Sequence, residues 1–303
     1  MIISASRRTD IPGYYFLWFL KRLEEGYLYV KNPYFKKQIH MVDLSPGKID
    51  CIVFWTKYPA QMVENLHTFL EYNIPFYILF TITPYNRTIE KNIPEKTQII
   101  KMFKYLSEKI GKEKLIWRYD PFILFSTFNV QKHSESFENI ASELEGYTER
   151  CILGFLTLYK KLEKNLTPLN ISLLSLTQKA EIALNLSRIA SKYGIKLQTC
   201  AEDLSGTPAS HLTGKCIDDK LIKRITHKKI SSEKDRGQRS SCKCIKSIDI
   251  GAYNTCPGGC IYCYANINTE MAKKNFKAHN PGIPILDGNF YTLTNLTNKN
   301  IMM

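Results

Sequence analysis

Short apolar runs rich in β-branched and aromatic residues alternate along the chain with segments whose apolar residues recur at helical spacing. This alternation is typical of a parallel sheet with crossover helices, and it predicts the α/β class. With so many strand–helix units, we expect a TIM-like, partial parallel β/α barrel. The predicted strands are Ile2–Ser6, Cys51–Trp55, Phe76–Ile82, Leu115–Tyr119, Cys151–Leu158 and Ile195–Thr199.

Between these strands, apolar residues three and four positions apart predict amphipathic helices. The last of them should begin at Thr177 as N-cap and end before Gly194, because a glycine takes up the backbone conformation that ends a helix. The predicted helices lie within Tyr15–Leu23, Met62–Leu70, Ile99–Ile110, Phe137–Leu144 and Thr177–Tyr193.

Polar or charged residues follow each predicted strand, in the stretches SRRTD, WTK, TPY, WRYDP, LYKK and CAED. The carboxyl ends of barrel strands open at one mouth, where active sites lie. Loops of this kind are polar in any case, so the repetition over six units supports the prediction more than any single residue. We expect catalytic roles for Arg7, Asp10, Arg118 and Asp120. The wider set expected in one pocket is Arg7, Arg8, Asp10, Lys57, Arg118, Asp120, Glu202 and Asp203.

The last third of the chain departs from this pattern. After Cys216 comes a basic, serine-rich stretch, and then SIDIGAY, which predicts a seventh strand. From Asn280 onward, Pro, Gly, Asn and Thr dominate without any period. We therefore expect a barrel-like domain over 1–215, a cysteine-rich C-terminal segment over 216–280 that completes the barrel, and a loosely held tail over 281–303.

Composition and charge indicate where the protein is located and what it binds. No run reaches the roughly 18 to 20 apolar residues of a membrane helix, and Arg7 and Arg8 interrupt the start before a signal peptide could develop. We expect a cytoplasmic protein with no membrane partner. The net charge of +14 favours an acidic partner such as nucleic acid, and the densest basic stretch is Lys220–Lys246. Part of that basicity can instead balance the negative charge of a metal cofactor beside it.

Nine cysteines in a reducing compartment favour metal ligands or catalytic groups over disulfides. Cys51 and Cys151 stand singly in apolar runs, where a cysteine is usually a small buried hydrophobe. The other seven lie together in the last third of the chain: Cys200, Cys216, Cys242, Cys244, Cys256, Cys260 and Cys263.

The loop CPGGCIYC supplies three thiols at the spacing CxxxCxxC, and Gly258 and Gly259 let its backbone wrap a cofactor. A four-iron cluster takes one thiolate on each iron, so three thiolates leave one iron to an outside ligand. We predict a [4Fe–4S] cluster on Cys256, Cys260 and Cys263. Structural zinc usually has two CxxC-like knuckles, and a cysteine nucleophile would not explain three cysteines in eight positions.

Four clustered cysteines remain once the loop is set aside, namely Cys200, Cys216, Cys242 and Cys244. Four is the number that a second, fully ligated cluster requires. Their irregular spacing, with a tight CxC, leaves a zinc site as an equal alternative. One of the four is also an alternative fourth ligand of the first cluster, which would close that cluster to any cofactor.

The CxxxCxxC spacing with Tyr262 before the last cysteine resembles the signature loop of the radical S-adenosylmethionine enzymes. The resemblance implies that the open iron chelates S-adenosylmethionine, whose reductive cleavage gives a 5′-deoxyadenosyl radical that abstracts hydrogen from the substrate. It also implies an electron donor such as flavodoxin or ferredoxin, and cofactor contacts from Gly258, Gly259 and Tyr262. A Gly-Gly-Glu segment for the cofactor's amino group is missing, and Glu202 or Asp120 is the expected substitute.

Residues from about Ile2 to Ala265 also resemble a family known as domain of unknown function 1848, whose members look like barrels that end in this cysteine cluster. The matching stretches are SRRTDIP with Tyr15, Phe54–Lys57, Trp117–Pro121, Gly237–Arg239 with the following CKC, and Asp249–Ala265.

Radical enzymes of this type carry the cysteine loop after the first barrel strand, whereas here it follows the last predicted strand. We expect SIDIGAY to lie beside the first strand, as in a circular permutation, so that the loop reaches the same mouth. The first functional hypothesis is therefore a radical enzyme of unknown substrate.

The alternative is a non-catalytic iron–sulfur or zinc protein that binds nucleic acid through Lys220–Lys246. A radical enzyme acting on a nucleic acid would combine both hypotheses. Tyr85 and Tyr119 could then stack on a base, although core packing is their expected role.

Overall fold

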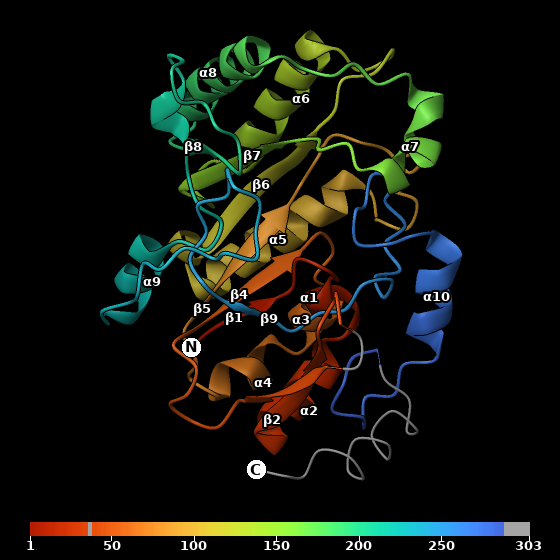
Figure 1. The fold of residues 1–303 in the computed structure, drawn as a ribbon. Helices are drawn as coiled ribbons and strands as arrows, with labels where there is room; N and C mark the ends of the chain where they lie inside the picture. Colours follow the sequence, from red (N-terminus) through yellow and green to blue (C-terminus); the bar gives the residue numbers. More distant parts are fainter. Residues whose placement is uncertain (36–37, 288–303) are drawn as a thin grey trace.

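The computed structural model describes residues 1–35 and 38–287. Its centre is a sheet of seven strands in the order β8-β7-β6-β5-β4-β1-β9, with every neighbouring pair parallel (Figure 1). The predicted α/β class is confirmed. The edge strands are β8 and β9, and the described residues show no pairing between these two edges. The strands are β1 (Ile2–Ala5), β4 (Cys51–Thr56), β5 (Phe76–Thr81), β6 (Leu115–Phe122), β7 (Arg150–Phe155), β8 (Lys196–Thr199) and β9 (Ile248–Asp249).

All six predicted strands are present, and so is the seventh, within SIDIGAY. As predicted, β9 lies beside β1, with Ile3 opposite Ile248 and Ser4 opposite Asp249. A two-stranded antiparallel sheet of β2 (Tyr27–Lys31) and β3 (Ile39–Asp43) lies outside the main sheet and was not predicted from the sequence.

The five predicted helical segments are helical, with two corrections. The segment 62–70 is broken at Asn65, where the backbone leaves helical geometry, into α3 (Ala60–Glu64) and α4 (Leu66–Glu71). The N-cap of α8 (Leu176–Lys192) is Ser175 rather than Thr177, because Ser175 and Gln178 form a reciprocal capping box. The other helices are α1 (Ile11–Tyr14), α2 (Phe16–Glu25), α5 (Lys96–Ile110), α6 (Val130–Glu143), α7 (Lys160–Leu166), α9 (Asp219–Thr226) and α10 (Thr269–Lys277).

The two faces of the sheet are covered differently. One face packs its alternate residues, such as Phe54, Ile78 and Trp117, against the helices in the main hydrophobic core. The other face, with Val53 and Leu79, packs against residues of the chain between β8 and β9, including Cys216, Ile217, Leu221, Ile222, Cys242, Cys244 and Ile245. In Figure 1 this connection, drawn in teal to light blue, crosses the sheet. The cysteine-rich segment is therefore part of the folded core.

Residues 281–287 of the predicted tail are held against the body of the protein. Ile285 and Leu286 are buried, the backbone N–H of Tyr29 donates to the carbonyl of Pro284 at 2.7 Å, and the Trp18 indole donates to Ile283 at 2.9 Å. The rest of the predicted tail, 288–303, lies outside the described residues.

Among the residues that the structure describes, no helix has the length and apolar character needed to cross a membrane.

His133 on α6 is the one histidine in the described chain that is fully enclosed by the core. Its ring stacks on Phe122 at 3.7 Å, donates from Nε2 to the carbonyl of Ile123 at 2.9 Å, and accepts at Nδ1 from the Tyr119 hydroxyl at 2.7 Å. Burial lowers the pKa of His133 from 6.5 to about 4.

This shift predicts a pH-dependent stability. Between about pH 6.5 and pH 4 the unfolded chain binds a proton that folded His133 does not, so the free energy of unfolding falls as the pH falls. The contribution of His133 to this loss is roughly 3 kcal/mol. Denaturant unfolding of the wild type and of His133→Gln at both ends of this range measures it, because glutamine does not titrate. An equal loss in both proteins contradicts the assignment.

Candidate functional site

A cavity of about 970 Å³ opens at the carboxyl ends of the strands. Of the eight charged residues expected there, six line it: Arg7, Arg8, Asp10, Lys57, Arg118 and Asp120. Glu202 and Asp203 do not. The Glu202 carboxylate instead accepts a hydrogen bond from Lys179 at 2.9 Å, and Asp203 is exposed.

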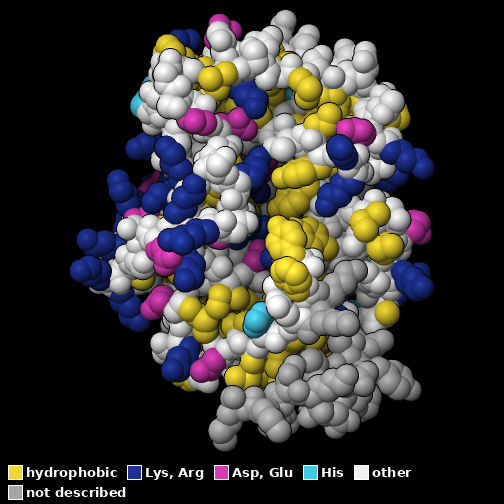
Figure 2. All heavy atoms as spheres, in the orientation of Figure 1, with side chains coloured by type: hydrophobic (Ala, Val, Ile, Leu, Met, Phe, Trp, Pro, Cys, Tyr) yellow, Lys and Arg dark blue, Asp and Glu magenta, His cyan; other side chains and the backbone are white. Residues whose placement is uncertain are grey.

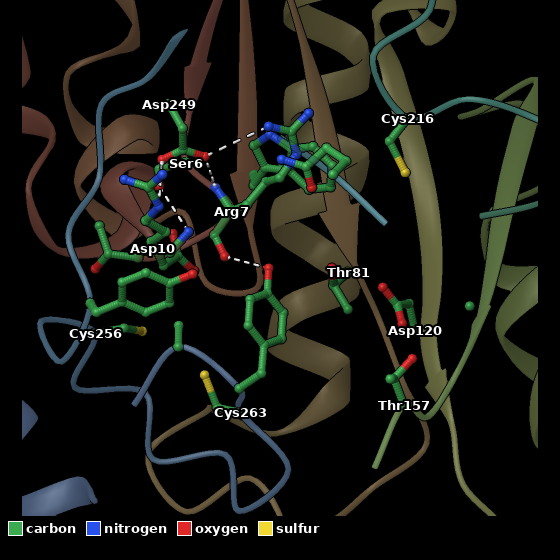
Figure 3. A pocket seen from close by; sticks show the side chains of 18 of the residues that line it. Ser6, Arg7, Asp10, Thr81, Asp120, Thr157, Cys216, Asp249, Cys256 and Cys263 are labelled. Atoms are coloured by element: carbon green, nitrogen blue, oxygen red, sulfur yellow. Dashed lines mark hydrogen bonds and ion pairs between the residues drawn. The ribbon is translucent and has the colours of Figure 1, made fainter. Parts of the chain in front are cut away.

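All seven clustered cysteines line this one cavity. In Figure 3, Cys256 and Cys263 lie together on one side, and Cys216 lies on the opposite side. The three thiols of the loop and the other four cysteines therefore form two groups that face a shared space.

The cysteine loop 256–263 is held by the connection between β5 and α5. The backbone N–H of Ile261 donates to Ile89 at 3.0 Å, and Asn92 donates its backbone N–H to Gly258 and its side chain to Pro257, at 3.2 and 2.7 Å. Gly259 has φ +69°, and a Cβ there would lie 2.9 Å from the Asn92 side chain. Glycine is therefore required at position 259, because of its positive φ and because a larger side chain would collide with Asn92.

Glu90 anchors the same loop through its side chain. It is 1% exposed and accepts from Lys57 Nζ at 2.7 Å, from Lys96 Nζ and Thr83 Oγ1 at 2.5 Å each, and from the hydroxyl of Tyr262. Burial alone would raise the pKa of Glu90, but the two lysines outweigh it and lower the pKa to about 2. Glu90 was not predicted from the sequence, because nothing marks one glutamate in a polar loop as a partner of a tyrosine 172 positions away.

The three loop thiols influence one another. Burial raises the pKa of Cys256 to about 12, with further contributions from Asp10 and Cys263. Burial also raises the pKa of Cys260, and the charges of Glu90, Cys263 and Cys256 add to it against the opposing charge of Lys57. A metal that binds here must displace thiol protons, which costs free energy that the metal–thiolate bonds have to outweigh.

Among the described residues, no three cysteine, histidine or carboxylate side chains converge on one point as the ligands of a single ion do. A [4Fe–4S] cluster makes a different demand, because each thiolate binds a separate iron and the ligands surround a cube.

Asp10, predicted to be catalytic, is engaged with the backbone. One oxygen accepts from Gly13 at 2.9 Å, and the other accepts from the N–H groups of Lys57 and Tyr58 at 2.7 and 3.2 Å. Asp10 therefore caps α1 and ties the loop after β1 to the loop after β4. Burial raises the pKa of Asp10 to about 6 against these hydrogen bonds.

Asp249, the last residue of β9, fixes the same loop from the other side. Its carboxylate accepts from the hydroxyl of Ser6 at 2.6 Å and from the backbone of Arg7 at 2.9 Å (Figure 3). It also accepts from the backbone of Gly251 at 3.1 Å. The role of Asp249 was not predicted from the sequence.

Two arginines enclose the ring of Trp55. The Cζ atoms of Arg7 and Arg118 lie 5.3 and 4.8 Å from its centroid, within the range of cation–π attraction. Arg118 forms an ion pair with Asp120. Burial lowers the pKa of Arg118, but the charge of Asp120 and then those of Cys216 and Cys200 raise it overall.

Gly154 on β7 makes room for Asp120. A Cβ at this glycine would lie 2.4 Å from an oxygen of the Asp120 carboxylate. Any larger residue would therefore push this carboxylate, and with it the Arg118 ion pair, away from its place at the cavity.

The four other cysteines form a chain of contacts. The Sγ atoms of Cys200 and Cys216 are 3.1 Å apart, and Cys244 Sγ accepts from the backbone of Ile217 at 3.3 Å. Hydrogen bonds from the thiols of Cys216 and Cys242 lower the pKa of Cys244. These cysteines come from the end of β8, from the loop before α9, and from the approach to β9.

Comparison with protein families gives one finding. The family described as a domain of unknown function (DUF1848) matches residues 2–265, from β1 through the cysteine loop. No curated protein and no solved structure matches the chain.

Glu90→Gln tests the anchor of the cysteine loop. It leaves Lys57 and Lys96 facing a neutral amide in a buried site, so the free energy of unfolding should fall by about 3 kcal/mol. Denaturant unfolding measures the loss. The matched control is Glu95→Gln, which removes an exposed pair with Arg87 and should change stability by less than about 1 kcal/mol. Equal losses in the two variants would contradict the anchoring role.

Proposed function

The chain belongs to the DUF1848 family, and we propose that it is an iron–sulfur enzyme of the radical S-adenosylmethionine type. The observation that carries the proposal is the position of the three-thiol loop. It follows β9, which pairs in parallel with β1, and its three cysteines border the cavity at the carboxyl ends of the strands. This is where the active sites of parallel α/β proteins lie.

The cavity suits a polar cofactor of moderate size. Its volume of about 970 Å³ is at the upper end of the range typical of small-molecule sites. Buried side-chain oxygens of Thr9, Tyr14 and Thr56, which line it, lack a hydrogen-bond partner in the described structure. Such atoms need a partner, and a ligand with carboxylate, amino and hydroxyl groups offers several.

In this proposal Cys256, Cys260 and Cys263 hold the cluster. A [4Fe–4S] cluster with an open iron supplies the electron and the coordination site for reductive cleavage of S-adenosylmethionine. The protein's own contribution is to position these thiols and to enclose the site. Glu90 holds the Tyr262 hydroxyl, and Gly258 borders the cavity, so the loop presents its thiols inward.

Asp120 is the candidate partner for the amino group of the cofactor, because its carboxylate borders the cavity. Glu202, the other candidate, pairs with Lys179 and is not among the residues that line this cavity. The electron would come from a carrier such as flavodoxin or ferredoxin.

Anaerobic reconstitution with iron and sulfide tests the proposal. The wild type should hold about four irons on the loop and, with a strong reductant, convert S-adenosylmethionine to 5′-deoxyadenosine. Cys260→Ala should abolish the product, whereas Cys151→Ala, a buried cysteine on β7, should retain it. Chromatography of the nucleoside products measures this. A loaded and reduced wild type that leaves the cofactor intact would refute the proposal.

One observation favours a second candidate, binding of nucleic acid. The basic stretch lies on α9 and the loop that follows, and Lys and Arg side chains gather on this side of the molecule (Figure 2). Phosphate groups bind such surfaces with little sequence preference. The exposed basic residues of the stretch 220–246 are Lys220, Lys223, Arg224, Lys228, Lys229, Lys234, Arg236, Arg239, Lys243 and Lys246.

This candidate predicts binding to duplex or single-stranded DNA or RNA that weakens steeply with salt. Fluorescence anisotropy over a salt series should give a steep negative slope, reduced by about one per lysine lost in Lys223→Gln and Lys228→Gln. Lys104→Gln, on α5, serves as the control lysine. An affinity that does not change with salt concentration would exclude electrostatic binding of nucleic acid by this stretch.

A further inference from the structure

We propose that Cys200, Cys216, Cys242 and Cys244 form a second metal centre of four thiolates, which fastens the segment that carries β9 to the body of the sheet. The shared chemistry is that of a thiophilic metal, either a closed [4Fe–4S] cluster or one Zn²⁺, and both take four cysteine ligands. A single zinc ion would in addition have to draw the thiols onto one point, because no three of them share one in the described structure. This centre is independent of the cysteine loop and of the function proposed for it.

The first support is that four cysteines gather from three separate parts of the chain. Cys200 follows β8 at one edge of the sheet, whereas Cys242 and Cys244 precede β9 at the opposite edge. Yet the Sγ atoms of Cys200 and Cys216 are 3.1 Å apart, the thiol of Cys244 accepts from the backbone of Ile217, the residue after Cys216, and all four cysteines line one cavity. Four unlinked thiols gathered in a protein interior are the donor set that a soft metal requires.

The second support is the surroundings of the four thiols. Cys216, Cys242 and Cys244 are buried, and Cys200 is half-buried. Four thiolates with one zinc ion, or with a [4Fe–4S] cluster, carry a net charge of about −2, which is costly to bury without counter-charges. Arg7 and Arg118 line the same cavity and bring positive charge to it, which they share with the carboxylates of Asp235, Asp249 and Asp120.

Unpaired donors on these arginines point to a missing partner. Nη2 of Arg7 and Nε of Arg118 are buried, and neither has a hydrogen-bond partner among the described residues. Buried guanidinium N–H groups rarely remain unsatisfied, because each loses its hydrogen bonds to water without replacement. Thiolate sulfur bound to a metal is an acceptor that retains negative charge, so a filled centre offers them one.

The third support is the short pairing between β9 and β1. Only two register positions, Ile3 opposite Ile248 and Ser4 opposite Asp249, pair β9 with β1. A strand this short contributes few hydrogen bonds, so the position of the cysteine loop depends on other attachments of this segment. A metal bridging Cys244, four residues before β9, to Cys200 and Cys216 would fix that segment covalently to the opposite edge of the sheet.

The test uses the full chain without the first cluster, as the variant Cys256→Ala/Cys260→Ala/Cys263→Ala. Elemental analysis and a sulfide assay of the anaerobically purified protein should give about one zinc per chain, or about four irons with four sulfides. Adding Cys242→Ala and Cys244→Ala should remove this metal, whereas adding Cys51→Ala and Cys151→Ala should not. A folded triple variant without stoichiometric metal would overturn the proposal, as would metal that survives the loss of Cys242 and Cys244.

A second measurement covers the case in which the five-cysteine variant does not fold. Wild-type protein is treated with a thiol-alkylating reagent before and after a strong chelator, and the modified cysteines are mapped by mass spectrometry. The proposal predicts that the chelator raises labelling at Cys200, Cys216, Cys242 and Cys244 together, with no change at Cys51 and Cys151. Labelling that ignores the chelator, or a disulfide between Cys200 and Cys216 in the anaerobic protein, would refute the four-thiolate centre.

Discussion

The site depends on one pairing, in which the last strand of the described chain lies beside the first. The β9–β1 pair adds a seventh parallel strand at the sheet edge, and the cysteine loop leaves the carboxyl end of that strand. Asp249 reinforces the pair, because its carboxylate binds Ser6 and the backbone of Arg7 in the loop after β1. Without this arrangement the loop would have no defined place relative to Arg7, Arg118 and Asp120.

Near this pair, several buried polar side chains bind the short cysteine loop. The buried Glu90 carboxylate accepts hydrogen bonds from two lysines and a threonine, and it also accepts from the hydroxyl of Tyr262, the residue before Cys263. Asn92 fixes the loop backbone at two carbonyls. Buried ion pairs of this kind are weak sources of stability, so their worth lies in fixing one geometry, as a metal-binding loop requires.

Much of the fold could be predicted from the sequence because strands buried on both faces leave long apolar runs, as in Cys51–Thr56 and Phe76–Thr81. The position of β9 was predicted correctly, because in a barrel-like sheet the last strand can lie beside the first, which brings the cysteine loop after it to the mouth. The two residues of β9 alone would not have predicted it. The β2–β3 hairpin was missed because its exposed strands carry a mixed pattern, with buried residues only at Leu28 and Val42.

The site was harder to predict in detail than the fold. Its thiols and six of eight charged residues were identified, because strand ends in a parallel sheet share one edge. Glu90 and Asp249 were missed, since their roles arise from contacts across more than 170 positions. Glu202 was expected at the mouth, but the chain turns at Ala201, where φ is +52°, and the Glu202 carboxylate meets Lys179 instead.

The central claim is that three thiolates leave one iron of the loop cluster open to S-adenosylmethionine. Electron paramagnetic resonance of the reduced, cluster-loaded protein tests it directly, recorded with and without that cofactor. Coordination at an open iron should change the g-values of the cluster signal, and Cys242→Ala/Cys244→Ala should show the same change. A signal that is identical with and without the cofactor would mean that a fourth protein ligand closes the cluster.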